Sequence, residues 1–426
     1  MSLRATANSL KGPVGLTKAS RDSLDSVPDL CELEKWYPGC AGASESEIQV
    51  LDFFSGCGGM SLGFAAAGLA GAGFRVIGAV DINEVSSNTF TSNFGAPSVV
   101  CDVREIAASQ KKLEELMLRF PEYDPDKPLV LIGCAPCQGF SAHRKTNWDA
   151  PDHRNSLVEA FAEVAVALRP ACVVMENVPE LLSGKYREHF DAYRDRLDSH
   201  GFTTKQVVHN AAQYGTPQAR FRALIISMDA RDFALPSPVL EPKNYRTVRD
   251  AIGGLPKVEA GVASLRDPLH KSAHHRESTI GVIKSVPKNG GSRPVGIGPA
   301  CLDRVKGFSD VYGRLAWDKP SITITHYARN PASGRFVHPV QDRGLTMREV
   351  ARLQGFPDSF VFTGKSDDVY RQIGEAVPPP MAIGVAKVVA TNVQSNYKSI
   401  DVQDFANLSS KNSFSELGER LKIGQR

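Results

Sequence analysis

Three short stretches of the sequence contain the residue types that could carry out chemistry. They are Pro136-Cys137-Gln138, Glu176-Asn177-Val178 and Gln218-Ala219-Arg220-Phe221-Arg222. Each lies next to an apolar run that predicts a buried strand. A thiol nucleophile, a carboxyl acid and a pair of guanidinium groups can therefore meet at one edge of one sheet. Covalent attack on a pyrimidine ring requires such a set of groups.

The segments that must position these groups alternate between strand and helix patterns. Predicted strands cover residues 48–53, 75–80, 97–100, 129–132, 172–175 and 223–226. One predicted helix begins at residue 60, and others cover 156–168, 186–200 and about 380–392. A capping box from Thr346 to Glu349 predicts one more short helix, which ends at Gly355. The alternation predicts an α/β fold with a doubly wound, mostly parallel sheet. Ligands bind such sheets at the carboxyl ends of the strands.

The regular pattern occupies only part of the 426 residues, which suggests several regions. We expect a flexible N-terminal arm (1–46), a catalytic and cofactor-binding domain (47–230), a smaller loop-rich domain (231–340), a return to the catalytic domain (341–394) and a polar tail (395–426). The loop-rich region has 17 lysines and arginines against 9 acidic residues, whereas the whole chain carries only +3. This basic block suggests a polyanionic partner, although a solvated basic surface explains the charge equally well.

Composition and cysteine usage are those of an ordinary globular protein. No run of 18 apolar residues appears, so no membrane-spanning helix is expected, and the N-terminus lacks a signal pattern. Four of the eight cysteines lie in or beside predicted strands, which suits reduced, buried thiols. We therefore expect a soluble cytoplasmic enzyme with no membrane contact.

The glycine-rich turn Ser55-Gly56-Cys57-Gly58-Gly59 after the first strand is typical of a nucleotide site. The dinucleotide fingerprint needs glycine at position 61, where Ser61 stands instead. Asp81 and Asp102 follow the second and third strands and could hold a ribose and an adenine amino group. Together these residues favour an adenosyl ligand without a pyrophosphate. A tight turn with no ligand is the alternative.

Cys134 and Cys137 have the spacing of a redox pair or of half a zinc site. No second C-x-x-C or matching histidine pair completes a metal site, so we expect no metal and a free thiolate. Glu176 ends a strongly apolar strand, where a charged group must face a cleft or a partner, and a carboxyl group shielded from water can donate a proton near neutral pH. Arg220 and Arg222 point to the same side of an extended segment and suit a base oxygen, a phosphate or a carboxylate. A structural salt bridge is the alternative for the arginines.

The order of these motifs resembles that of the cytosine-C5 DNA methyltransferases, of the bacterial restriction-modification type. The resemblance runs from Gln49 to Val389 and rests on six blocks: Asp52-Phe-Phe-Ser-Gly-Cys-Gly-Gly59, Gly133-Cys-Ala-Pro-Cys-Gln-Gly-Phe-Ser141, Glu176-Asn177-Val178, Gln218-x-Arg220-x-Arg222, Leu345 to Pro357, and Gly374-x-Ala-Val-Pro378. The family usually has asparagine after Gly374, and this chain has Glu375. The resemblance implies a Rossmann-like methyltransferase domain and a smaller target-recognition domain at about 231–340.

The resemblance also implies roles for individual residues. S-adenosylmethionine would bind at Phe54, Gly56, Cys57, Gly59, Asp81, Ile82, Asp102, Val103, Pro136, Leu157, Ala376 and Val377. Catalysis would use Cys137 as nucleophile, Glu176 as acid, and Arg222, Arg220, Gln138 and Asn177 around them. The expected reaction is methylation of C5 of a cytosine flipped out of double-stranded DNA, through a bond from Cys137 to C6.

Other functions remain open at this level. An RNA-methylating branch of the same family shares the catalytic residues but has a reduced recognition region, so the length between Arg222 and Leu345 favours DNA. An NAD-dependent oxidoreductase would use the glycine turn, and a silent DNA-binding module would lack the catalytic pair that this chain keeps. We further expect a monomer, with a cognate restriction endonuclease acting on the same site as a candidate partner.

Overall fold

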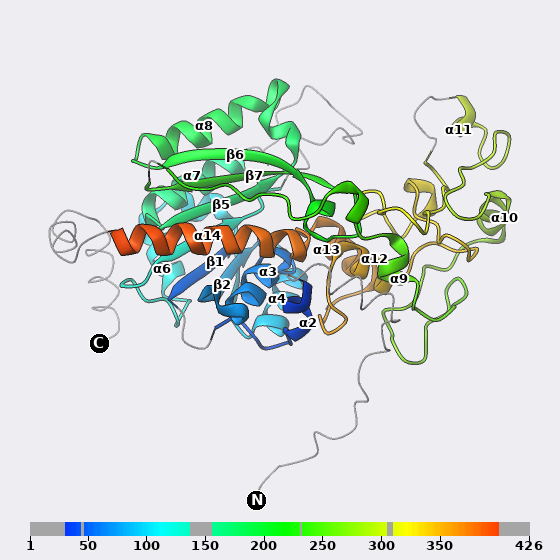
Figure 1. Ribbon diagram of the computed structural model, residues 1–426, viewed down its shortest axis with the longest axis horizontal. Coiled ribbons are helices and arrows are strands. Elements are labelled where there is room, and N and C mark those ends of the chain that lie inside the picture. Colours follow the sequence, from blue (N-terminus) through cyan, green and yellow to red (C-terminus); the bar gives the residue numbers. More distant parts are fainter. Residues whose placement is uncertain (1–29, 44–46, 137–155, 231, 305–309, 400–426) are drawn as a thin grey trace, which may run out of the picture.

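The computed structural model describes residues 30–43, 47–136, 156–230, 232–304 and 310–399 (Figure 1). Its centre is a seven-stranded sheet with the order β3-β2-β1-β4-β5-β7-β6. The strands are β1 (Ile48–Phe53), β2 (Phe74–Asp81), β3 (Ser98–Val100), β4 (Leu129–Gly133), β5 (Cys172–Asn177), β6 (Thr203–Asn210) and β7 (Phe221–Met228). The first five are parallel, and β7 runs antiparallel to both β5 and β6. The predicted α/β class with a mostly parallel sheet is confirmed.

Helices cover both faces of the sheet, because the central strands are apolar on both sides. One face packs against α3 (Gly59–Ala67), α4 (Glu84–Phe94) and α14 (Pro379–Ser399), and the other packs against α5 (Val103–Ala107), α6 (Gln110–Met117), α7 (Ser156–Leu168) and α8 (Arg187–Asp198). In Figure 1, α14 crosses the front of the sheet. The α13–α14 stretch is long and apolar enough to cross a membrane, but 78% of its most apolar window is buried inside the protein, as in a core helix.

The segment expected to be a flexible arm contributes to the core. Residues 30–43 contain the short helix α2 (Leu30–Lys35), and Trp36 is 1% exposed. The Trp36 indole stacks on Phe360 with ring centroids 5.7 Å apart, and its Nε1 donates to the Cys40 carbonyl over 2.9 Å. Burial of a large aromatic side chain stabilises this segment against the catalytic domain. At the other end, α14 continues to Ser399, beyond the expected boundary at 394.

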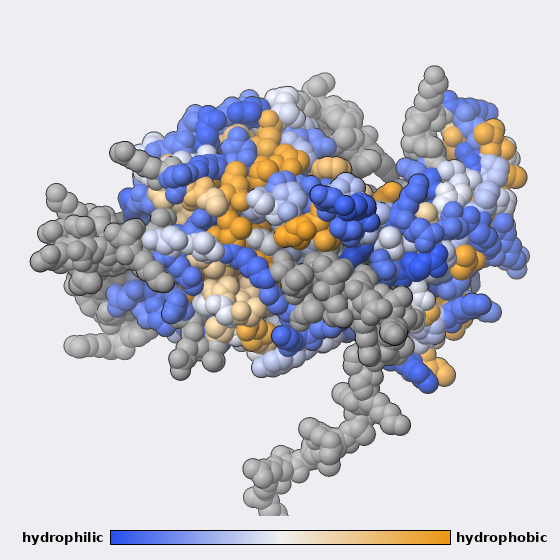
Figure 2. All heavy atoms as spheres, viewed as in Figure 1, coloured by the Kyte–Doolittle hydropathy of each residue, from blue (hydrophilic) through white to orange (hydrophobic). Residues whose placement is uncertain are grey.

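A second lobe lies beside the sheet at the right of Figure 1. It contains α9 (Val248–Ile252), α10 (Glu277–Ser285) and α11 (Cys301–Arg304), and α12 (Met347–Gln354) and α13 (Ser366–Glu375) lead back to the sheet. The described residues also contain one short π-helix, η1 (Gly68–Ala72), and several short 3₁₀ helices. The 3₁₀ helices are η2 (Pro179–Leu182), η3 (Gly184–Tyr186), η4 (Ala211–Tyr214), η5 (Pro242–Asn244) and η6 (Pro331–Ser333). On the viewed face, hydrophobic residues gather over the sheet domain, whereas the lobe is mostly hydrophilic (Figure 2).

The lobe packs partly on itself and partly on the sheet. The residues Ile283, Val286, Val311, Tyr312 and Val337 form a cluster of their own. By contrast, α9 packs into the large cluster that contains α14. The lobe is therefore packed on the sheet through α9.

Candidate active site

The predicted catalytic motifs lie at the carboxyl edge of the sheet. Pro136 follows β4, while Glu176 and Asn177 end β5. Because β7 is antiparallel, its first residues come to the same edge, where Asn177 is paired with Ala223. Cys137 and Gln138 lie outside the described residues.

Glu176 and Arg222 form a buried ion pair at this edge. Arg222 Nε lies 2.7 Å from Glu176 Oε1, and the two side chains are 11% and 8% exposed. Within the described part of the chain, Glu176 Oε1 accepts no hydrogen bond, so the N–H is not aimed at it. The pair keeps the carboxyl group at the edge of the sheet and leaves that oxygen able to accept a hydrogen bond from a ligand.

Asn177 connects the acid motif to the segment that precedes Cys137. Its Nδ2 donates to the Ala135 carbonyl over 3.2 Å, and its Oδ1 accepts from the Val178 amide over 2.9 Å. The Asn177 side chain is 1% exposed. Both ends of the amide are therefore used to hold backbone groups, which indicates a positioning role.

Arg220 lies apart from Glu176 in its described contacts. Its Nη1 donates to the Ile324 carbonyl over 2.8 Å, and its Nη2 donates to the carbonyls of Gly374 and Ala376 over 3.2 and 3.3 Å. Gln218 supports the same junction by accepting from the Ile324 amide. The two arginines, which the sequence analysis grouped together, therefore have different contacts. Arg222 pairs with Glu176, whereas Arg220 binds the backbone around Ile324 and Gly374 next to the start of β7.

The glycine turn after β1 leaves open space at the same edge. Gly56 has φ +53°, and a Cβ at this position would meet nothing within 4 Å. Its amide donates to Asp81 Oδ2 over 2.8 Å, while the Asn83 amide donates to Asp81 Oδ1 over 2.7 Å. Burial raises the pKa of the Asp81 carboxyl above its usual value, and these backbone bonds oppose that rise. The carboxylate retains acceptor capacity beyond these backbone bonds, which fits a ribose hydroxyl group.

Two residues of the glycine turn contact the segment that leads from the second lobe back to the sheet. A Cβ at Gly59 would lie 2.5 Å from the Val377 carbonyl oxygen, so only glycine allows this approach. The Cys57 thiol is 1% exposed and lies 3.6 Å from the Gln372 carbonyl. Burial raises the pKa of this thiol, which makes it an inert core group rather than a nucleophile.

The remaining predicted cofactor residues line the edge in different ways. Ile82 is 69% exposed, an unusual exposure for isoleucine that suits an apolar surface for a ring. The Asp102 carboxylate caps α5 and pairs with Arg104, whose hydrogen bonds hold the pKa of Asp102 below its usual value. An adenine amino group would therefore compete with Arg104. Phe54 has φ +55°, Val103 is buried, and Pro136, Leu157 and Ala376 are half-buried.

Asp52 is a buried acid that the sequence reasoning did not select. Its side chain is fully buried in the middle of the sheet, and Ser61 Oγ donates to Asp52 Oδ2 over 2.6 Å. Burial raises the pKa of Asp52 to about 8, so the carboxyl group is mostly protonated at neutral pH. The sequence feature that could have identified Asp52 is the presence of a carboxyl group within the apolar first strand. Over the described ranges, no group of three or more His, Cys, Asp or Glu residues could hold a metal ion.

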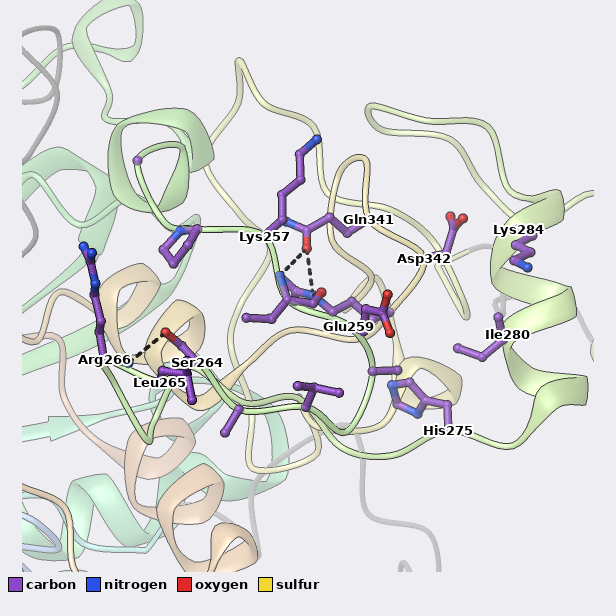
Figure 3. Close-up of a pocket in the computed structure, with 17 residues that line it drawn as sticks. Lys257, Glu259, Ser264, Leu265, Arg266, His275, Ile280, Lys284, Gln341 and Asp342 are labelled. Atoms are coloured by element: carbon purple, nitrogen blue, oxygen red, sulfur yellow. Dashed lines mark hydrogen bonds between the residues drawn. The ribbon is translucent and has the colours of Figure 1, made fainter.

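A groove of about 1120 Å³ lies in the second lobe, and Glu176 is not among the residues that line it (Figure 3). Its rim carries side chains of both signs, including Lys257, Lys284, Glu259 and Asp342. Gln341 Oε1 closes one side by accepting from the Val258 amide over 3.1 Å. The mixed charge and the internal hydrogen bonds indicate a structural groove of the lobe rather than a second reactive site.

Comparisons with known proteins show the family and the fold to which this chain is similar. The family described as C-5 cytosine-specific DNA methylase matches residues 48–391. The type II methyltransferase M1.HphI of Haemophilus parahaemolyticus is 37% identical over 80% of this chain and 86% of its own length. The type II methylase M.HgiDII of Herpetosiphon aurantiacus is 31% identical over 80% of this chain and 94% of its own. A putative DNA modification methyltransferase from an Escherichia coli prophage has the same fold, with a TM-score of 0.63, 24% identity and coverage of 82% and 99%.

Proposed function

The chain belongs to the C-5 cytosine-specific DNA methylase family and is a DNA (cytosine-5)-methyltransferase of the restriction-modification type, and from that premise we propose how it works. It flips a target cytosine out of duplex DNA and methylates C5 through a transient covalent bond between Cys137 and C6. The observation that carries the proposal is the Glu176–Arg222 pair at the edge of the sheet where the segment leading to Cys137 also arrives.

The covalent bond is needed because C5 of cytosine is a poor nucleophile. The Cys137 thiolate adds its electron pair to C6, and the proton of Glu176 passes to N3 as the ring takes up the charge. C5 then behaves like the carbon of an enamine and takes the methyl group. A water molecule then takes the proton from C5 and the Cys137 thiolate leaves C6 with the bonding electrons. N3 returns its proton to the Glu176 carboxylate, which restores the aromatic ring and the starting state of the acid.

The residues at the glycine turn fit S-adenosylmethionine. When bound, this cofactor supplies a methyl group that is electrophilic because its sulfur is a sulfonium. Asp81 would hold the ribose, Ile82 would lie against the adenine, and Gly56 would admit the ligand because it has no side chain. Gly59, Ala376 and Val377, which lie against one another, would complete the site beside the glycine turn.

DNA is recognised through the basic second lobe in this proposal. Taking one base out of the stack costs a few kcal/mol, and contacts from lysine and arginine to phosphate offset that cost. The region 231–340 would act as the target-recognition domain, since it carries 17 basic against 9 acidic residues. We further propose a monomer in the cytoplasm, with a restriction endonuclease of the same sequence specificity as its partner.

The decisive experiment traps the covalent bond. Duplex DNA with 5-fluorocytosine at the target cannot lose a proton from C5, so it should stay attached to the protein through Cys137 after methyl transfer. Peptide mapping identifies the attached residue, and Cys137→Ala should bind DNA without forming the adduct. An active preparation that forms no adduct, or an adduct at another residue, would refute the mechanism.

The substrate class is tested separately with labelled methyl groups. Purified protein is offered duplex DNA or tRNA at equal cytosine concentration, and mapping of 5-methylcytosine in the DNA of an expressing host gives the target sequence. Transfer to tRNA alone would overturn the assignment to DNA.

A further inference from the structure

A buried histidine and a buried tyrosine form a short hydrogen bond next to the proposed active site. His209 Nδ1 lies 2.5 Å from the Tyr214 hydroxyl oxygen, and the two side chains are 9% and 1% exposed. Neither residue belongs to the machinery derived above. Burial of two polar side chains in a hydrophobic core costs free energy unless they hydrogen-bond to each other. The position of this pair therefore suggests a function.

The strand register places this pair in line with the catalytic acid. His209 on β6 is the cross-strand partner of Arg222 on β7, and Glu176 on β5 is the partner of Leu224. Cross-strand partners project from the same face with their Cβ atoms about 4.5–5.5 Å apart. Since Arg222 and Leu224 are two residues apart, Glu176, Arg222 and His209 form a row across one face of three neighbouring strands.

Both members of the pair are uncharged. Burial lowers the pKa of His209 and raises that of Tyr214, so the imidazole is neutral and the phenol keeps its proton. The Tyr214 hydroxyl donates to Nδ1 in one tautomer of the neutral ring, and Nδ1–H donates to the hydroxyl oxygen in the other, so either tautomer keeps the ring in place. A neutral ring can lie beside the Arg222 guanidinium without repelling it, whereas an imidazolium could not.

Tyr214 itself is held rigidly. It ends the η4 turn, and its ring packs so closely on α14 that a Cβ at Gly384 would lie 2.5 Å from it. The chain of contacts therefore runs from α14 through Tyr214 and His209 to the strand position next to Arg222.

We propose that His209 and Tyr214 are positioning residues for catalysis: Tyr214 orients the His209 ring, which in turn restricts Arg222 to the position in which it pairs with Glu176. This inference rests on the proposed function, because it assigns Glu176 and Arg222 to the methyl transfer. The predicted effect is on the chemical step, since neither residue contacts DNA or the methyl donor in this scheme.

The test compares variants that remove the hydrogen bond with one that keeps it. Tyr214→Phe and His209→Leu should each lower kcat about tenfold, the effect of one hydrogen bond, while KM for DNA and for S-adenosylmethionine stays within about twofold. His209→Asn, whose amide oxygen can still accept from Tyr214, should recover most of kcat. The double variant should lose no more than either single variant, because the two residues act as one unit.

Tyr370→Phe is the matched control. Its hydroxyl is equally buried and donates to the Leu345 carbonyl over 2.7 Å, away from the row of strands. Unchanged kcat in both Tyr214→Phe and His209→Leu, or an equal loss in Tyr370→Phe, would overturn the inference. A wild-type protein with no methyl transfer to duplex DNA would instead refute the proposed function, so the two failures are distinguishable.

Discussion

The Asn177 side chain holds the Ala135 carbonyl, with Nδ2 3.2 Å from the oxygen. This bond joins two stretches that are about forty positions apart in the sequence and that both contribute to the proposed chemistry. It fixes the last described residues before Cys137 relative to the strand that ends in Glu176. In the proposed mechanism, this neutral amide holds the segment before Cys137 against the strand that carries Glu176.

Removal of that amide should impair turnover without abolishing DNA binding. Asn177→Ala leaves the buried Ala135 carbonyl without its donor, at a cost of about 1–3 kcal/mol. We expect single-turnover methyl transfer to slow about tenfold or more, with the dissociation constant for DNA within about threefold. Asn177→Ser, which offers a shorter donor, serves as the control and should lose less. Equal rates for wild type and Asn177→Ala would show that the bond does not position the reacting groups.

Arg220 and Arg222 should respond differently to the same substitution. Arg220→Lys replaces a guanidinium that serves three backbone carbonyls, so the free energy of unfolding should fall by about 2–4 kcal/mol. Arg222→Lys should leave stability within about 1 kcal/mol but lower kcat, because the change affects the partner of Glu176. Thermal unfolding and steady-state kinetics on both variants make the comparison. A larger loss of stability in Arg222→Lys than in Arg220→Lys would contradict it.

Alanine substitutions at two glycines of the same turn should have different effects, one on the stability of the fold and the other on ligand affinity. Gly59→Ala places a Cβ against the Val377 carbonyl and should destabilise the fold by about 1–3 kcal/mol. Gly56→Ala costs about 1 kcal/mol of backbone strain, but its methyl group enters the space assigned to the ligand. We expect its affinity for S-adenosylmethionine, measured by calorimetry, to fall at least about tenfold. Wild-type affinity in Gly56→Ala would place the ligand elsewhere.

The second lobe should lose stability as the solution is acidified. Burial lowers the pKa of His338 from 6.5 to about 4, and its Nδ1 accepts from the amides of Val340 and Gln341. The unfolded chain therefore binds this proton more readily, so the stabilisation is complete above pH 6.5 and is lost as pH falls toward 4, at about 1.4 kcal/mol per unit.

Urea unfolding at a series of pH values measures this dependence. His338→Asn, which keeps an acceptor but does not titrate in this range, should show a smaller decline between pH 6.5 and 4. Identical slopes for wild type and variant would mean that His338 is not the group responsible.

The sequence alone predicted the α/β sheet, its central strands and the capped helix at Thr346, because buried parallel strands are continuous apolar runs with polar residues at their ends. It did not predict β6. This edge strand is only partly buried and its residues, Thr203 to Asn210, are mainly polar, so no alternation stands out. It also assigned residues 30–43 to a flexible arm, since a short segment whose partners are distant, such as Trp36 on Phe360, has no periodicity of its own.

For the candidate site, residue types and order along the chain were sufficient to select Glu176, Arg222 and the glycine turn. Only the tertiary structure decided what each group contacts. The antiparallel β7 brings Arg222 to the acid and turns Arg220 toward the Ile324 and Gly374 carbonyls, and β6 adds His209 to the same row. The physical reason is that a sequence records local preference and hydrophobic pattern, whereas cross-strand neighbours and ion pairs depend on how distant strands are ordered and registered.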